Sequence, residues 1–170
     1  MLLQAVNMTP RIETLVQKKL VGKRKKMSFT KNETFELWRN FMPERNTIKN
    51  VVGKELYSLE VYDKNFFSPF SPDKEFEKWA AVEVSGFENA PAGMERLTVP
   101  AGLYAVFIHK GAATEAERTY NFIFSEWLPG SNYVLDNRPH FAIMGEKYKK
   151  DSPEAEEEIW IPVQPKDYRK

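Results

Sequence analysis

The chain has 170 residues, a length that suits one domain and is short for two. It contains no cysteine, which excludes a disulfide framework, a thiol nucleophile and a thiolate metal site. The formal net charge of +1 gives no general attraction to nucleic acid or acidic membranes, and no segment approaches the roughly 20 apolar residues of a membrane-spanning helix. Because the N-terminus also lacks a secretory signal pattern, we expect a cytoplasmic protein without membrane association.

Aromatic residues are abundant, with 4 Trp, 7 Tyr and 12 Phe. Most such rings belong to a core, but a surplus is also what an aromatic-lined ligand pocket requires. A local basic cluster comprises Lys18, Lys19 and residues 23–26. It could contact phosphate or form the solvated face of an edge strand, and the lack of a recognition-helix pattern favours the strand.

The first half of the chain predicts a strand, a helix and two further strands. Residues 11–26 alternate in part and predict a strand, while residues 30–33 offer Thr and Asn as helix N-caps. Apolar residues then recur at helical spacing until Pro43: Phe35, Trp38, Phe41 and Met42. Residues 55–62 and 76–84 are strand-like, and a polar loop with prolines separates them.

The second half repeats this order. Residues 96–109, with a turn at Pro100–Gly102, predict one long bent strand or a hairpin. Thr114 is the expected cap of a helix that Pro129–Gly130 stops. The apolar face of this helix comprises Tyr120, Ile123, Phe124, Trp127 and Leu128. Residues 141–148 and 157–163 are the last two predicted strands.

Both halves therefore have the order β-α-β-β, and each helix ends in a tryptophan followed by a proline. We expect one α+β domain over residues 1–170, with repeat one at about 10–86 and repeat two at about 92–165. A duplicated module of this kind predicts a pseudo-twofold antiparallel sheet with both helices on one face. The other, helix-free face of the sheet, or the seam between the repeats, is then free to be concave and to form a ligand cleft.

The C-terminal strand is the strongest candidate for part of a site. Strand alternation places Glu156, Glu158 and Trp160 on one face, and Glu157 with the branched aliphatic residues on the other. A carboxylate beside an indole suits an organic cation, because the negative charge and the ring quadrupole both favour it. An exposed tryptophan on an ordinary solvent-facing strand is the competing interpretation.

Superposing the two halves makes Trp79 the pseudo-twofold mate of Glu158, and Tyr62 and Tyr148 end the preceding strands. The candidate ligand-binding residues are Glu158, Trp160, Trp79, Tyr62, Tyr148 and Trp38. Each ring taken singly fits a core position, so this prediction depends on their convergence. A register error of one residue would make Glu157 the inward acid instead.

Metal and cofactor chemistry finds little support. His109 and His140 are the only histidines, and they lack the spacing of a metal site. There is no nucleophile-elbow motif and no glycine-rich phosphate loop. We therefore expect neither a metal nor a cofactor.

Three segments resemble one known family, the GyrI-like small-molecule-binding domain, which is also the effector-binding domain of AraC-type and multidrug-sensing transcription regulators. They are Glu158-Ile-Trp-Ile-Pro-Val163, Ala101-Gly-Leu-Tyr-Ala-Val-Phe107, and Trp127-Leu-Pro129 with Tyr133 and Pro139-His-Phe141. The resemblance covers about residues 10–165. It implies a tandem β-α-β-β fold, a cleft between the repeats, and Glu158 as the acid that meets cationic aromatic compounds.

The resemblance leaves three functions open. The favoured one is a stand-alone binding module, related to regulatory sensors, for a hydrophobic and cationic small molecule. The second is a hydrolase of electrophilic, cyclopropane-containing compounds, with Glu158 as general base and Tyr148 as its partner. The third is a gyrase-inhibitor-like protein that binds a macromolecule. No helix-turn-helix precedes Arg11, so direct DNA binding is not expected. The ligand, the oligomeric state and the inward acid among Glu156, Glu157 and Glu158 stay open.

Overall fold

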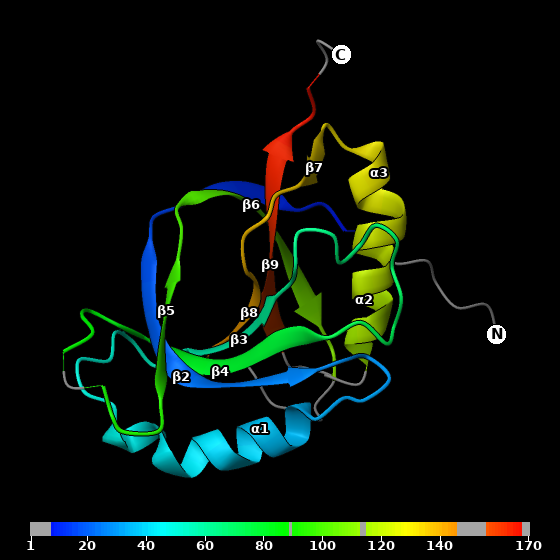
Figure 1. The fold of residues 1–170 in the computed structure, drawn as a ribbon. Coiled ribbons are helices and arrows are strands. Elements are labelled where there is room, and N and C mark those ends of the chain that lie inside the picture. Colours follow the sequence, from blue (N-terminus) through cyan, green and yellow to red (C-terminus); the bar gives the residue numbers. More distant parts are fainter. Residues whose placement is uncertain (1–7, 89, 113–114, 146–155, 168–170) are drawn as a thin grey trace.

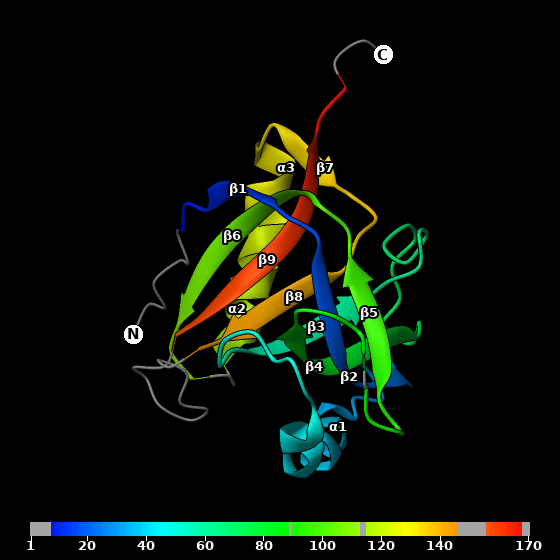
Figure 2. The same cartoon turned by 90° about the vertical axis from the view of Figure 1, so that its left-hand side faces the viewer.

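A computed structural model describes residues 8–88, 90–112, 115–145 and 156–167. They form a nine-stranded antiparallel sheet with helices packed against it (Figures 1 and 2). The strands of the first half are β1 (Arg11–Leu15), β2 (Lys18–Met27), β3 (Leu56–Val61) and β4 (Phe76–Val84). Those of the second half are β5 (Glu95–Val99), β6 (Gly102–Lys110), β7 (Tyr133–Leu135), β8 (His140–Met144) and β9 (Glu156–Pro165). The helical segments are α1 (Thr34–Phe41), the 3-10 segment η1 (Met42–Thr47), α2 (Ala116–Phe122), the π-helical segment η3 (Ile123–Trp127) and α3 (Leu128–Gly130).

The strand order is symmetric about the centre of the sheet. Neighbours follow the order β1-β6-β9-β8-β3-β4-β2-β5, with β7 added to β9. Strands β1 and β5 start 84 residues apart, at Arg11 and Glu95, and so do β2 and β6, at Lys18 and Gly102. The predicted α+β fold, a tandem β-α-β-β repeat about a pseudo-twofold axis, is therefore confirmed.

The long strands at the start of each repeat are bent. The segment predicted as one strand at residues 11–26 is divided between β1, which pairs with β6, and β2, which pairs with β4 and β5. The equivalent segment at residues 96–109 is likewise a bent strand rather than a hairpin, because β5 and β6 pair with different partners. These crossed pairings curl the sheet, as Figure 2 shows.

The two faces of the curled sheet carry separate cores. On the outer face, Leu37 and Phe41 of α1 pack with side chains of β2 and β4, and Ile123 of η3 packs with side chains of β6 and β9. Both helices thus lie on one face, as predicted. The inner, helix-free face encloses a third set of buried residues that includes Tyr57, Trp79, Tyr104, Phe141 and Trp160.

The helix boundaries agree with most of the local signals. The N-cap of α1 is Glu33, without a side-chain capping hydrogen bond, so the prediction of Thr or Asn as the cap is wrong; Asn32 nevertheless accepts a hydrogen bond from the Thr34 amide at 3.0 Å. The α-helix ends at Phe41, before Pro43, although the chain continues as η1 to Thr47. Phe35 was predicted on the apolar face, but it is 66% exposed. The predicted cap Thr114 lies outside the described residues. Among the described helices, none is both long and apolar enough to cross a membrane.

The basic cluster on β2 is matched by acidic neighbours. Over Lys18–Gly22 the strand is internal, between β4 and β5, so only its second half is the predicted edge. The ion pairs are Lys18–Glu83, Lys23–Glu44, Arg24–Glu77, Arg24–Glu95, Lys25–Glu33 and Lys25–Glu36. This pairing favours the solvated strand over a phosphate-contacting arm.

Candidate functional site

Glu158 and Trp160 share the helix-free face of β9, as strand alternation predicts. The Trp160 indole donates a hydrogen bond to Glu158 Oε1 at 3.0 Å, and Arg11 Nη2 donates one to Oε2 at 3.2 Å. The Arg11 guanidinium also lies 5.9 Å from the centroid of the Trp160 ring. A cation of the chain itself therefore sits beside this carboxylate and indole.

The same arrangement recurs in the first repeat. Trp79 donates to Glu77 at 2.8 Å, Arg24 donates to Glu77 at 2.8 Å, and the Arg24 guanidinium lies 5.9 Å from the Trp79 ring. Trp79 pairs with Leu59 and Glu158 pairs with Ile143, and these two partners are again 84 residues apart. The register thus makes Trp79 the symmetry mate of Glu158, as the superposed sequences indicated.

These tryptophans do not line an open cleft. Trp79 is 3% exposed and Trp160 is 7% exposed, because the curled sheet closes around them together with Tyr104 and Phe141. The helix-free face was expected to be concave and accessible. Instead its side chains fill a core, and Glu158 stands at the rim of that core.

The remaining predicted site residues lie elsewhere. Tyr62 and Trp38 pack into the cluster on the helix side of the sheet, opposite to Glu158. Tyr62 was predicted to lie near Glu158 because Tyr62 ends a predicted neighbouring strand. The two side chains lie on opposite faces of the sheet. Tyr148 lies outside the described residues. The six predicted side chains are therefore not gathered at one place in the described structure.

Glu157 faces the helix side, between the repeats. Its neighbour across the strands is His109, whose ring is engaged by Thr119 Oγ1 at 2.8 Å and by the Ala112 carbonyl at 3.1 Å. Within the described ranges, Glu157 makes neither a hydrogen bond nor an ion pair. Burial raises the pKa of the Glu157 carboxyl, Glu60 adds to that increase, and His109 and Lys78 oppose it. Among the described carboxyl groups, Glu157 is the one whose pKa is clearly raised.

A phenol lies close to this acid. Burial raises the pKa of Tyr120 well above its ordinary value, and the charges of Glu60 and Glu157 raise it further. Tyr62 is perturbed in the same way by burial and by Glu60. Because each effect requires proximity, the two phenols and the two carboxylates share one region between the helices. Glu60 is itself paired with Lys78.

Aromatic rings bridge the seam between the repeats above this region. Tyr62 lies 4.9 Å from His140 and 5.0 Å from Phe67, and Phe67 lies 5.7 Å from Phe124, all between ring centroids. Tyr62 and Phe67 come from the end of β3 and the β3–β4 loop, whereas Phe124 belongs to η3 and His140 to β8. Burial lowers the pKa of His140 to about 3, so this imidazole is uncharged at neutral pH. The seam is thus lined by neutral rings.

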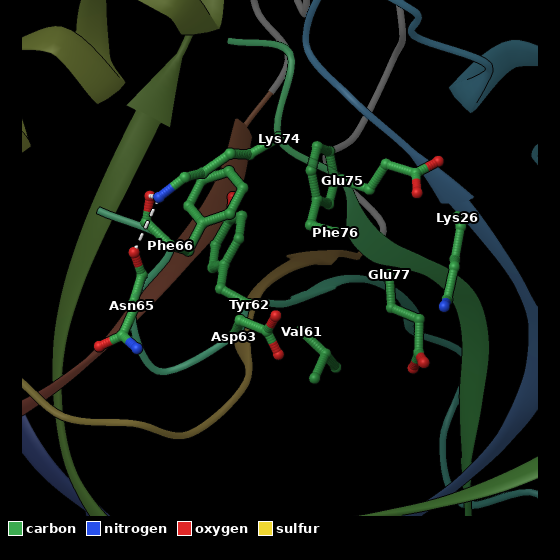
Figure 3. A pocket seen from close by; sticks show the side chains of 10 residues that line it. All are labelled: Lys26, Val61, Tyr62, Asp63, Asn65, Phe66, Lys74, Glu75, Phe76 and Glu77. Carbon is green, nitrogen blue, oxygen red and sulfur yellow. Dashed lines mark hydrogen bonds between the residues drawn. The ribbon is translucent and has the colours of Figure 1, made fainter. Parts of the chain in front are cut away.

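A hollow of about 500 Å³ opens beside these rings. Tyr62, Phe66 and Phe76 form its apolar wall, and charged side chains of the β3–β4 loop surround it (Figure 3). Its volume falls within the range of small-molecule sites. Phe66 contacts Tyr62 and Phe67, which are two of the rings at the seam. The hollow therefore borders the seam rings on one side.

The sequence contained a signal for this cluster that the prediction passed over. The segment between β3 and β4 was taken as a polar loop with prolines, yet it carries three phenylalanines: Phe66, Phe67 and Phe70. Aromatic residues in a loop need a partner surface, and Phe67 finds it in the second repeat. In the described ranges, no group of three or more His, Asp or Glu residues is arranged to hold a metal ion.

The described residues form a duplicated α+β module with aromatic rings at the seam between its halves. Residues 8–164 match the family model described as GyrI-like small molecule binding domain. The match covers nearly the whole chain, so the chain belongs to the GyrI-like family.

Known proteins that are similar to this chain include a transcriptional regulator and a structure with a bound small molecule. The transcriptional regulator BrlR of Pseudomonas aeruginosa is 27% identical over 130 residues, which are 75% of this chain and 45% of BrlR. This chain therefore spans less than half of that relative. SAV2435 bound to tetraphenylphosphonium has a TM-score of 0.68 at 17% identity, over 92% of this chain and 94% of SAV2435. The C-terminal domain of EcmrR has a TM-score of 0.68 at 16% identity, over 95% of this chain and all of that domain (100%). The two structures support the shared fold.

Proposed function

We propose that this protein binds a hydrophobic organic cation at the seam between its repeats, with Glu157 as the counter-charge. The observation that carries this proposal is the half-buried Glu157 carboxylate, which has no hydrogen bond or ion pair among the described residues. Desolvating a charge is costly unless a partner compensates it. A ligand cation would supply the missing partner, whereas a neutral ligand of the same shape would not.

Glu158, the acid that the family resemblance implied, is the weaker candidate for this role. Arg11 and the Trp160 indole already satisfy both of its oxygens, at 3.2 and 3.0 Å. A ligand cation would have to displace Arg11 before it gained anything from this carboxylate. Glu157 requires no such exchange, and its raised pKa is consistent with a charge that is under-compensated.

The surroundings of Glu157 suit an aromatic cation. Tyr62 and Phe124, which both contact the His140 ring, offer ring faces whose negative quadrupoles attract positive charge. His140 remains neutral and so does not repel a cation. The complex of SAV2435 with tetraphenylphosphonium supports this ligand class through the shared fold. The similarity to BrlR supports a role related to ligand sensing in regulation.

The direct test is a matched pair of compounds, methyltriphenylphosphonium and triphenylphosphine oxide. They share three phenyl groups and differ in net charge. Isothermal titration of the purified protein should give saturable binding of the phosphonium, about tenfold or more tighter than that of the oxide. Equal affinities would refute a counter-charge in the site, and no binding of either compound would refute the proposal as a whole.

A second candidate, hydrolysis of a reactive electrophile, is favoured by one specific observation. Tyr120 lies close enough to Glu157 for the carboxylate to raise the pKa of the phenol. An acid with a raised pKa beside a phenol is an arrangement that can activate water and protonate a leaving group. Incubation with a cyclopropane-containing alkylating compound, followed by mass spectrometry, would detect an added water molecule. Either of two results would exclude this function: the compound stays unchanged, or the Glu157→Gln variant converts it as fast as the wild-type protein.

A further inference from the structure

Three nearly parallel rings meet at the seam, and one of them comes from a loop. The planes of Phe67, Phe124 and His140 lie within 31° of one another, with centroid separations of 5.7 to 6.1 Å. These separations are typical of interacting aromatic pairs. Phe124 and His140 belong to η3 and β8, so their positions are fixed by the second repeat. Phe67 reaches them from the β3–β4 loop of the first repeat.

Phe67 is held far less firmly than its neighbour Phe66. Phe66 is 2% exposed and anchors the loop in the core, whereas Phe67 is 36% exposed. Lys74 fastens the loop backbone through hydrogen bonds to the carbonyls of Asn65 at 3.0 Å and Phe66 at 3.3 Å. A rotation of the Phe67 side chain would therefore remove its ring from the seam while the loop backbone stayed in place.

Three adjacent strands carry small side chains on the helix side of the sheet. Ser58 of β3 lies between Ala80 of β4 and Ala142 of β8 in the strand register, so three adjacent strands carry small side chains at the same level. These residues lie on the helix side, the same side as Phe66. Both alanines are buried, which means that larger side chains from above cover this floor.

We propose that the Phe67 ring occupies the place of the ligand's aromatic group in the unliganded protein, and that a ligand binds by displacing it. The ligand class is accordingly a cation with at least one freely projecting aryl ring, which takes the place of the Phe67 ring against Phe124 and His140. This inference depends on the proposed function and adds two elements, the required aryl group and the internal competitor. An aliphatic cation would lack the flat group that replaces Phe67.

Removing the competitor tests this directly. In Phe67→Ala the aryl slot is open, so methyltriphenylphosphonium should bind about tenfold tighter than to the wild-type protein, which corresponds to about 1.4 kcal/mol. Tetraethylammonium should show no such gain. Phe70→Ala is the matched control, because Phe70 is an exposed phenylalanine of the same loop that contacts Phe67 and Phe66 rather than the second repeat. Because Phe70 stacks on Phe67, Phe70→Ala should raise the phosphonium affinity much less than Phe67→Ala does, and it should leave the tetraethylammonium affinity unchanged.

The outcomes separate this inference from the proposed function. If the wild-type protein binds the phosphonium and Phe67→Ala binds it equally or more weakly, the internal competitor is refuted while the cation site stands. If neither protein binds it, both proposals fail. A second measurement does not depend on whether Phe67→Ala folds. In a protein that carries 4-fluorophenylalanine at position 67, the fluorine chemical shift should change when the phosphonium binds. An unchanged shift at saturation would overturn the displacement.

Discussion

His140 should make the protein sensitive to mild acid. The imidazole is 5% exposed, contacts the Tyr62 ring edge-to-face, stacks on the Phe124 ring, and forms no hydrogen bond with another described residue. Burial lowers the pKa of His140 from 6.5 to about 3 in the folded protein. The unfolded chain therefore binds the proton first as the pH falls. Its contribution to stability is fully present above pH 6.5 and is lost progressively between about pH 6.5 and 3.

The size of the effect follows from the two pKa values. At pH 5 the unfolded imidazole is protonated and the folded one is not, and each pH unit below 6.5 costs about 1.4 kcal/mol. The loss by pH 5 is therefore about 2 kcal/mol. In a chain of this size, that corresponds to a fall in melting temperature of roughly 4–8 °C.

The assay compares the wild-type protein with His140→Phe, which keeps a ring in the stack and removes the titrating group. Melting temperatures measured between pH 7.5 and 5 should fall less in the variant by about the amount given above. The carboxylates that titrate in both proteins lower both melting temperatures equally, so their contribution cancels in the comparison. Identical pH dependence in wild type and variant would refute the inference that His140 is kept neutral by burial.

Four further substitutions test the charges and the packing, each by thermal or denaturant unfolding. Glu157→Gln should raise stability by about 1 kcal/mol, because it removes an uncompensated buried charge, and a loss of stability would contradict this. Lys78→Met should cost about 3 kcal/mol by leaving Glu60 unpaired inside the fold, whereas the half-exposed Arg11→Met should cost less than about 1 kcal/mol. Equal losses in these two variants would contradict the difference in burial. Gly22→Ala should cost about 3 kcal/mol or more, since its Cβ would lie 2.0 Å from a carbonyl oxygen of β4, and a variant of normal stability would show that the strands can separate there.

Much of the fold could be predicted because the signals are local and repeated. Strand alternation, the helical spacing of Tyr120 to Leu128, and the two β-α-β-β patterns recover the symmetric sheet. The register even places Trp79 at the symmetry-related position of Glu158. The equivalence of positions in the two repeats depends only on the order and spacing of residues along the chain, and both can be read from the sequence.

The location of the site could not be predicted in the same way. Alternation correctly put Glu158 and Trp160 on one face, but it does not reveal that the sheet curls and buries that face. Nor does it show that Arg11, 147 residues away, pairs with Glu158. Contacts across the seam, such as Phe67 with Phe124, arise from tertiary packing between the repeats and have no local periodicity.

The most direct test of the account is a titration of methyltriphenylphosphonium into two neighbouring variants, Glu157→Gln and Glu158→Gln. Calorimetry is preferred to a thermal shift, because the first substitution is itself expected to change the melting temperature. The account predicts that Glu157→Gln weakens binding about tenfold or more, while Glu158→Gln stays within about twofold of the wild-type protein. Loss of binding in Glu158→Gln with full affinity in Glu157→Gln would place the counter-charge on the helix-free face and contradict the account.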